Sequence, residues 1–163
     1  MNEPNAANLL GALAAMIGDG VRDAVAPDPG TLVERTALSV LFKYPDCSIE
    51  ELRRPLALSH SGCVRLVDRL VAQGHVTRRT GADGRAVALR LTRSGRAVAA
   101  AGAEARAAYL LRLVRTLSPE ERAALGRLAT RLLDQGTPTP HAAATTCRLC
   151  DYDACRACPF RVR

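Results

Sequence analysis

The chain has few aromatic residues and no long apolar run. Its 163 residues include three tyrosines, two phenylalanines and no tryptophan, while alanine and leucine are abundant. This balance favours helices over a β-sandwich. No segment approaches the roughly 20 apolar residues that a membrane-spanning helix needs. The first twenty residues carry no Lys or Arg, unlike a secretion signal. We therefore expect a cytoplasmic protein that has no membrane partner.

Recognisable catalytic motifs are also missing from the sequence. The three histidines, His60, His75 and His141, form no known catalytic pair, and no glycine-rich phosphate loop is present. Apolar residues nevertheless make up 48% of the chain, which is enough for a folded core. The sequence predicts a folded protein without catalytic residues that is not an enzyme.

Positive charge is in excess, and it is concentrated in one region. The formal net charge is +7, and Lys43 is the only lysine. Between Ser48 and Arg96, ten arginines face four acidic residues, a net charge of +6 in less than a third of the chain. A genomic preference for arginine codons would spread this charge evenly. The clustering therefore indicates an anionic partner, because the arginine fork holds phosphate and guanine bidentately.

Periodicity and capping signals predict an order of elements. The spacing of apolar residues predicts helices at 8–25, 31–43 and 59–73. A further short helix is predicted to begin at the capping box Ser48–Glu51 and to be limited by Pro55. The segments 75–79 and 87–91 then read as a hairpin. Two further helices cover 92–117 and 118–136, followed by a linker at 137–140 and a cysteine-rich tail. The predicted fold is mainly α with a small β-hairpin wing, a winged helix-turn-helix.

The helix at 59–73 is amphipathic and carries the candidate reading face. Its core face contains Cys63, Leu66, Val67 and Leu70, whereas Ser61, Arg65, Asp68 and Arg69 share the opposite face. Arginines four residues apart behind small residues suit the floor of a DNA major groove. Arg78, Arg79 and Arg85 of the hairpin suit a minor groove or phosphates.

These segments resemble the MarR-type transcriptional regulators. The resemblance covers 31–98 and depends on 48–59, 64–70, Gly74–Arg79, the wing motif Asp83–Val87 and Leu91–Gly95. It implies a homodimer on a pseudopalindromic operator, usually as a repressor. The implied parts are an N-terminal dimerisation helix at 1–30, the DNA-binding domain at 31–98, C-terminal dimerisation helices at 99–136, and the linker with tail at 137–163. Without a partner, the apolar stripes of these flanking helices would form intramolecular core.

The resemblance also assigns roles to single residues. It implies DNA contacts for Ser59, Ser61, Arg65, Arg69 and Arg85, with Asp83 orienting the wing arginine. Asp68 is expected to hold a wing arginine in place. His60 either touches DNA or is merely exposed. The family further implies a small-molecule effector, often an aromatic acid, although no residue here identifies one.

The tail carries a four-cysteine motif, Cys147, Cys150, Cys155 and Cys158, with the spacing C-x2-C-x4-C-x2-C. Two such pairs can complete a tetrahedral thiolate site, most simply for zinc. An iron–sulfur cluster and metal-free thiols that form disulfides under stress remain alternatives. Because the tail has few bulky apolar residues, bound metal would have to supply its order. Cys63 is expected in the core, and Cys47 precedes a helix cap.

Three functions follow from these features. The first is a DNA-binding transcription regulator, and the second adds metal or redox sensing through the cysteine tail. The third is an iron–sulfur or thiol redox protein that uses the helical body as a scaffold. The third gives no reason for a basic wing.

Overall fold

The computed structural model describes residues 2–28, 31–80, 87–136, 139–151 and 154–155. In chain order the described elements are α1 (Glu3–Val25), α2 (Leu32–Lys43), α3 (Ile49–Leu56), α4 (His60–Ala72), β1 (Val76–Thr80), β2 (Val87–Leu91), α5 (Arg93–Val114), α6 (Pro119–Gly136) and α7 (Pro140–Thr146). The two strands pair in antiparallel fashion, from Val76 opposite Leu91 to Thr80 opposite Val87. The predicted fold class, mainly helical with a two-stranded hairpin, is confirmed.

Local capping fixes where α3 begins and ends. The Ser48 hydroxyl accepts from the Glu51 amide at 3.2 Å, and the Glu51 carboxylate accepts from the Ser48 amide at 2.8 Å. This reciprocal capping box confirms the predicted start of the helix. Pro55 lies inside α3, which ends one residue later, and Ala57 then turns the chain with a left-handed φ of 53°.

The core of the winged domain lies between α2, α3, α4 and the hairpin. Its largest fully buried side chains include Leu38, Leu41, Leu52, Leu66, Leu70 and Leu89. At one edge of the core, the first turn of α5 packs directly against His75, the residue before β1. A Cβ at Gly95 would lie 2.0 Å from the backbone oxygen of His75, so only glycine fits there without a shift.

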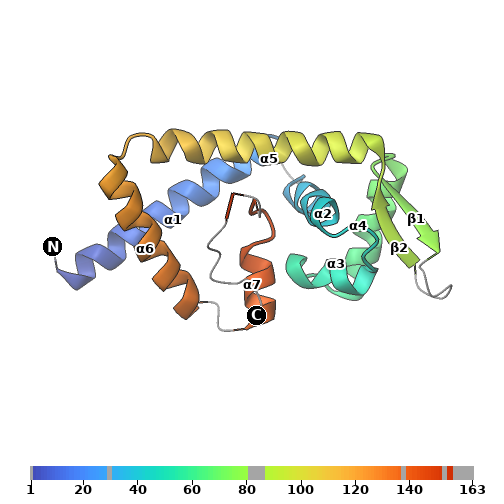
Figure 1. The fold of residues 1–163 in the computed structure, drawn as a ribbon. Coiled ribbons are helices and arrows are strands. Elements are labelled where there is room, and N and C mark those ends of the chain that lie inside the picture. Colours follow the sequence, from blue (N-terminus) through green and yellow to red (C-terminus); the bar gives the residue numbers. More distant parts are fainter. Residues whose placement is uncertain (1, 29–30, 81–86, 137–138, 152–153, 156–163) are drawn as a thin grey trace.

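The long helix α5 runs along the length of the molecule (Figure 1). It leads from the winged domain to α6 at the opposite end, and α1 runs alongside it. The Tyr109 hydroxyl donates to the Met16 carbonyl at 3.1 Å. Gly20 faces the same ring, and a Cβ there would lie 2.1 Å from Tyr109 Cζ. A side chain at position 20 would therefore displace the Tyr109 ring from its place between α1 and α5.

Much of the apolar surface of α1, α5 and α6 is uncovered in the single chain. The exposed side chains are Leu9, Leu10, Leu13, Met16, Leu111, Leu125, Leu128, Leu132 and Leu133. The alternative in which these stripes form intramolecular core is wrong for these side chains. Among the described helices, none combines the length and apolar character needed to cross a bilayer.

Part of the tail is ordered by packing on the winged domain. The predicted linker through Pro140 is wrong at its end, because Pro140 opens α7 and the Thr139 hydroxyl accepts from the Ala142 amide at 3.2 Å. Helix α7 packs against α3 (Figure 1). The Arg148 carbonyl accepts from Ser39 Oγ at 3.4 Å and from Lys43 Nζ at 3.2 Å. Packing on the winged domain therefore contributes to the order of this part of the tail, and a contribution of bound metal stays a prediction.

Candidate nucleic-acid interface

Helix α4 presents two chemically different faces. Cys63, Leu66, Val67 and Leu70 are buried, as predicted. Ser61, Arg65, Asp68 and Arg69 are exposed on the other side. The Ser59 hydroxyl caps the helix by accepting from the Gly62 amide at 3.1 Å, and Gly74 ends the turn after it with φ 72°. The exposed face of α4 is therefore polar, and its capped N-terminal end carries the small exposed residues Ser59 and Ser61.

The two arginines of this edge differ in their surroundings. Arg69 Nε donates to Glu34 Oε1 of α2 at 3.0 Å, and Gln73 Nε2 donates to the other oxygen of Glu34 at 3.4 Å. Within the described residues, Arg65 forms no ion pair. Arg65 is thus the more available of the two guanidinium groups, while Arg69 is held partly against the body of the domain. No local sequence pattern predicts the Glu34 contact, because the two residues are 35 positions apart.

An ion pair joins the hairpin to α4. Arg78 of β1 donates to Asp68 Oδ1 at 2.6 Å, and both side chains remain well exposed. The sequence predicts that Asp68 holds an arginine of the wing, and the structure brings Asp68 and Arg78 together. Exposed Arg79 lies next to Arg78 on the same strand. Helix and hairpin consequently form one continuous polar surface.

A second ion pair attaches the base of the wing to the turn before α3. Arg90 of β2 donates through Nε to Asp46 Oδ1 at 2.8 Å, and its Nη2 also bonds this carboxylate. The bond from Arg90 lowers the pKa of Asp46. The Asp46 amide donates to the Leu89 carbonyl at 3.0 Å. This contact was not predicted, and it fixes the hairpin relative to α3.

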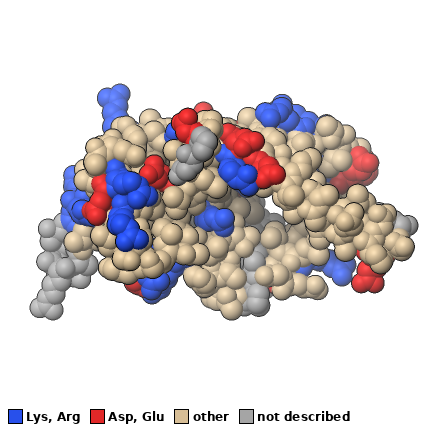
Figure 2. Space-filling view, turned by 180° about the vertical axis from the view of Figure 1, so that it is seen from behind, with Lys and Arg blue, Asp and Glu red and all other residues tan. Residues whose placement is uncertain are grey.

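Basic side chains gather over the winged end of the molecule, with acidic ones between them (Figure 2). His60 is exposed in the first turn of α4. A DNA contact of His60 stays a prediction. Asp83 and Arg85, the predicted wing pair, lie outside the described residues.

The comparisons with known proteins agree with this geometry. Residues 28–86 match the family model described as MarR family. A MarR family protein from Bacillus stearothermophilus is 28% identical, with 84% of this chain and 99% of that chain covered and a TM-score of 0.72. The fold is that of the MarR winged helix. No curated protein sequence matches the chain.

Two further solved structures share the MarR-like fold. One is the Mycobacterium tuberculosis MarR family protein RV2887 in complex with salicylic acid, at 26% identity over 76% of this chain and 93% of that chain, with a TM-score of 0.57. The other is MepR, a transcription regulator of the Staphylococcus aureus multidrug efflux pump MepA. It is 18% identical over 79% of this chain and 96% of that chain, with a TM-score of 0.68, and supports the fold alone.

The cysteines fall into a buried and a tail group. Cys63 is fully buried, and its thiol donates to the Ile49 carbonyl with a sulfur–oxygen distance of 3.7 Å, so its assignment to the core is confirmed. Burial raises the pKa of Cys63, and it raises the pKa of Cys47 to about 12. Both side chains are therefore protonated thiols at neutral pH and poor nucleophiles.

The four-cysteine motif is only partly within the described residues. Cys147 is buried, whereas Cys150 and Cys155 are half-buried. Cys158 lies outside the described part of the chain. Within that part, no three His, Cys, Asp or Glu side chains gather as metal ligands. The first three cysteines of the motif are therefore not assembled around one point in this conformation of the MarR-like chain.

Proposed function

We propose that this chain is a DNA-binding transcription regulator that acts as a homodimer, without enzymatic activity. The observation that carries the proposal is the exposed edge of α4 bearing Arg65, joined to the hairpin through the Asp68–Arg78 ion pair. In this arrangement α4 enters the major groove while the hairpin follows the neighbouring backbone. Ser59, His60, Ser61, Arg69, Arg79 and Arg85 complete the proposed DNA contacts, with Asp83 orienting Arg85.

The exposed leucines of α1 and α6 support the homodimer. Leu9 and Leu10 are about half exposed in the single chain, as are Leu128 and Leu132. Several exposed leucines on helices at the same end of the molecule are normally covered by a partner. A symmetric dimer would present two copies of α4 to half-sites one helical turn apart, which suits a pseudopalindromic operator. We propose repression as its mode of action and the cytoplasm as its location.

The DNA-binding proposal is tested with Arg65→Ala and the double variant Arg65→Ala/Arg69→Ala. The DNA probe is the duplex upstream of the chain's own gene. Wild-type protein should bind it with an affinity that falls steeply with salt, because arginines displace phosphate counterions. Each lost base contact removes about 1–3 kcal/mol of discrimination, so the double variant should bind this duplex no better than a scrambled one.

A matched control removes two arginines elsewhere. Arg127→Ala/Arg131→Ala changes the net charge equally on exposed positions of α6, and should keep the sequence preference. Unchanged preference in the Arg65→Ala/Arg69→Ala variant would contradict α4 as the reading helix.

We further propose that the tail adjusts DNA binding through metal or redox state. Four thiolates suit zinc, with an iron–sulfur cluster as the alternative. Cys147 and Cys150 flank the Arg148 carbonyl that Ser39 and Lys43 bind, so a change at these thiols is adjacent to α2. The alternative of a redox carrier with the helical body as scaffold is not favoured, because that body has a MarR-like fold.

Elemental analysis and an absorption spectrum of the purified full chain test the metal proposal. We expect a colourless protein with about one zinc per chain. Substitution of Cys147 and Cys150 by serine should abolish the bound zinc. A brown protein with visible absorption would select the iron–sulfur alternative, and protein without metal would refute both.

A further inference from the structure

One segment of the tail contacts two parts of the molecule. Residues 139–150 form a strap that consists of α7 and the short stretches on either side of it. Helix α7 packs against α3 of the winged domain. Beyond α7, Leu149 is half-buried and lines a narrow gap together with Val25 of α1, Ser39 of α2 and Ala99 of α5. The strap therefore connects the winged domain to the pair formed by α1 and α5.

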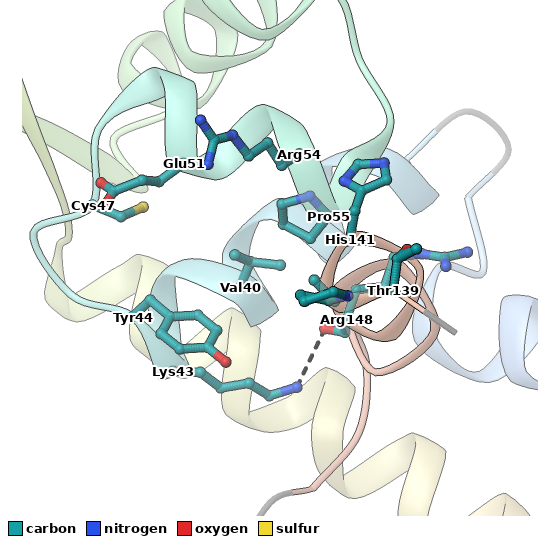
Figure 3. A pocket seen from close by; sticks show the side chains of 12 residues that line it. Val40, Lys43, Tyr44, Cys47, Glu51, Arg54, Pro55, Thr139, His141 and Arg148 are labelled. Atoms are coloured by element: carbon teal, nitrogen blue, oxygen red, sulfur yellow. Dashed lines mark hydrogen bonds between the residues drawn. The ribbon is translucent and has the colours of Figure 1, made fainter. Parts of the chain in front are cut away.

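Two hydrogen bonds attach the strap to α2. The Arg148 carbonyl accepts from Ser39 Oγ at 3.4 Å and from Lys43 Nζ at 3.2 Å. Figure 3 shows the second of these bonds, which joins α2 to the chain beyond α7. Ser39 and Lys43 are four positions apart in one helix and both are half-buried, so they share one face of α2. That face directs two donors at a single backbone oxygen of the strap.

Another side of the strap faces the end of α3. His141 and Thr139 lie opposite Pro55 across a cavity of about 620 Å³ (Figure 3). Pro55 is the last residue but one of α3. The Leu58 amide donates to the Arg53 carbonyl at 3.1 Å, directly before the cap of α4. A movement of the strap therefore changes what supports the turn between α3 and α4.

The strap can separate from the winged domain without unfolding it. All seven residues of α7 are described, and none of them is buried. The cavity leaves part of the facing walls of α3 and α7 without packing. The core of the winged domain is formed by other elements and does not include α7. An element with few buried apolar side chains opens at a lower free energy than the core.

We propose that the strap is an intramolecular restraint that fixes the turn between α3 and α4 relative to α2 and α5, and that its release weakens DNA binding. A reading helix that is already restrained loses less freedom when it binds, so the docked strap favours the complex. Cys147 and Cys150 flank the attached Arg148, so a change at these thiols acts on the attachment. The inference rests on the proposed function, for which it supplies the contact between the tail and α4.

Hydrogen exchange of the full chain without DNA tests the restraint. The first probe is the segment 142–150, whose amides are hydrogen-bonded within the strap, and the second is the turn at 57–58, whose amides donate to the end of α3. In the variant Ser39→Ala/Lys43→Met, which removes both bonds to Arg148, both probes should exchange at least about fivefold faster. Exchange in β1 and β2 should be unchanged, which would show that the winged domain is folded. Unchanged exchange at either probe overturns the proposal.

A second variant releases the strap from its other attachment. Leu149→Gln places an amide group in the gap between α1, α2 and α5, whereas Thr146→Gln places the same side chain on an exposed position of α7. Only Leu149→Gln should accelerate exchange at the turn between α3 and α4. Equal exchange in the two glutamine variants would contradict the bridging role of Leu149.

Binding to the duplex upstream of the chain's own gene gives the functional readout. Ser39→Ala/Lys43→Met and Leu149→Gln should each bind this duplex at least about fivefold more weakly than the wild type. Arg127→Met removes one positive charge from an exposed position of α6 and controls for the charge lost at Lys43. This control and Thr146→Gln should bind like the wild type. Equal or tighter binding by both released variants overturns the proposed effect of the strap.

The two measurements separate failure of the strap from failure of the regulator. If the wild-type chain does not bind the duplex, the regulator proposal fails, whereas faster exchange at the turn still supports the restraint. If the wild type binds the duplex and exchange is unchanged in both released variants, the regulator remains and the strap is refuted.

Discussion

At the residue scale, single glycines decide where elements can meet. The hydroxyl of Thr92 caps α5 by accepting from the Gly95 amide at 3.0 Å, and it also donates to the Gly74 carbonyl at 2.7 Å. These bonds place the first turn of α5 directly against the chain entering β1. Gly95 is buried there, and no side chain fits between it and His75. The close contact between α5 and the chain entering the hairpin therefore requires a residue without a side chain at position 95.

Gly95→Ala should destabilise the protein by about 1–3 kcal/mol, the usual cost of forcing extra atoms into a filled site. The measurement is the free energy of unfolding in urea. Gly126→Ala is the matched control, because a Cβ at Gly126 in α6 meets nothing within 4 Å, and helix propensity favours alanine there. An equal effect of the two substitutions would contradict the close approach at Gly95.

The ion pairs of the interface show a second principle at this scale. Arg69, Arg78 and Arg90 each bond one acidic residue from a different element. Exposed pairs of this kind add little stability. They restrict the directions that the guanidinium groups can take, which matters more for the proposed DNA-binding surface. The difference between Arg65 and Arg69 follows from this arrangement alone.

At the element scale, the stability of α3 depends on the capping interactions at its N-terminus. The bonds from the Ser48 amide and hydroxyl hold the pKa of Glu51 below its usual value. Similar bonds from Arg53 lower the pKa of Glu50. The folded chain therefore binds these protons less readily than the unfolded chain, and this contribution is present above about pH 4.5 and lost as the pH falls through the lower, folded values.

Glu51→Gln should accordingly destabilise the protein at pH 7 and have a smaller effect toward pH 3. Protonation in the acid range removes from the wild type the same negative charge that the substitution removes. Urea unfolding midpoints at pH 7, 5, 4 and 3 check this. Glu104→Gln, which removes an exposed carboxylate from α5, serves as the control for net charge. A Glu51→Gln effect that is constant with pH would show that the charge of the capping carboxylate contributes nothing.

At the scale of the whole molecule, the long α5 separates two surfaces. One end carries the polar edge of α4 and the hairpin, and the other carries the exposed apolar side chains of α1 and α6 (Figure 1). In the proposed dimer the apolar end fixes the distance between two reading surfaces. The tail lies between these ends, where α7 packs on α3.

Leu128→Asp/Leu132→Asp should convert a dimer into a monomer, because both leucines are at least half exposed in the single chain and a charge there would be costly to bury. Light scattering after size exclusion gives the mass. Phe42→Asp, at an equally exposed apolar position on α2, should leave the dimer intact. A wild-type chain that is monomeric at micromolar concentration would contradict the dimer proposal.

Local signals in the sequence were sufficient for most elements. The capping residues Ser48, Ser59, Thr92 and Ser118 each start a helix where predicted. The hairpin follows from alternation and a turn signal, and the two faces of α4 follow from its period. Helix α7 is not predicted, although Thr139–Pro140 is a recognisable start signal, because the cysteine motif is the dominant pattern of the tail.

The sequence by itself determined the order of the elements, the polar edge of α4 and the region of positive charge, because capping, periodicity and composition act over a few residues. Only the tertiary structure decided that Glu34 holds Arg69, that Asp46 holds Arg90 and that α7 forms a cavity with α2 and α3. These contacts join residues 35, 44 and about a hundred positions apart. Their partners are set by how the helices pack, which no short pattern encodes.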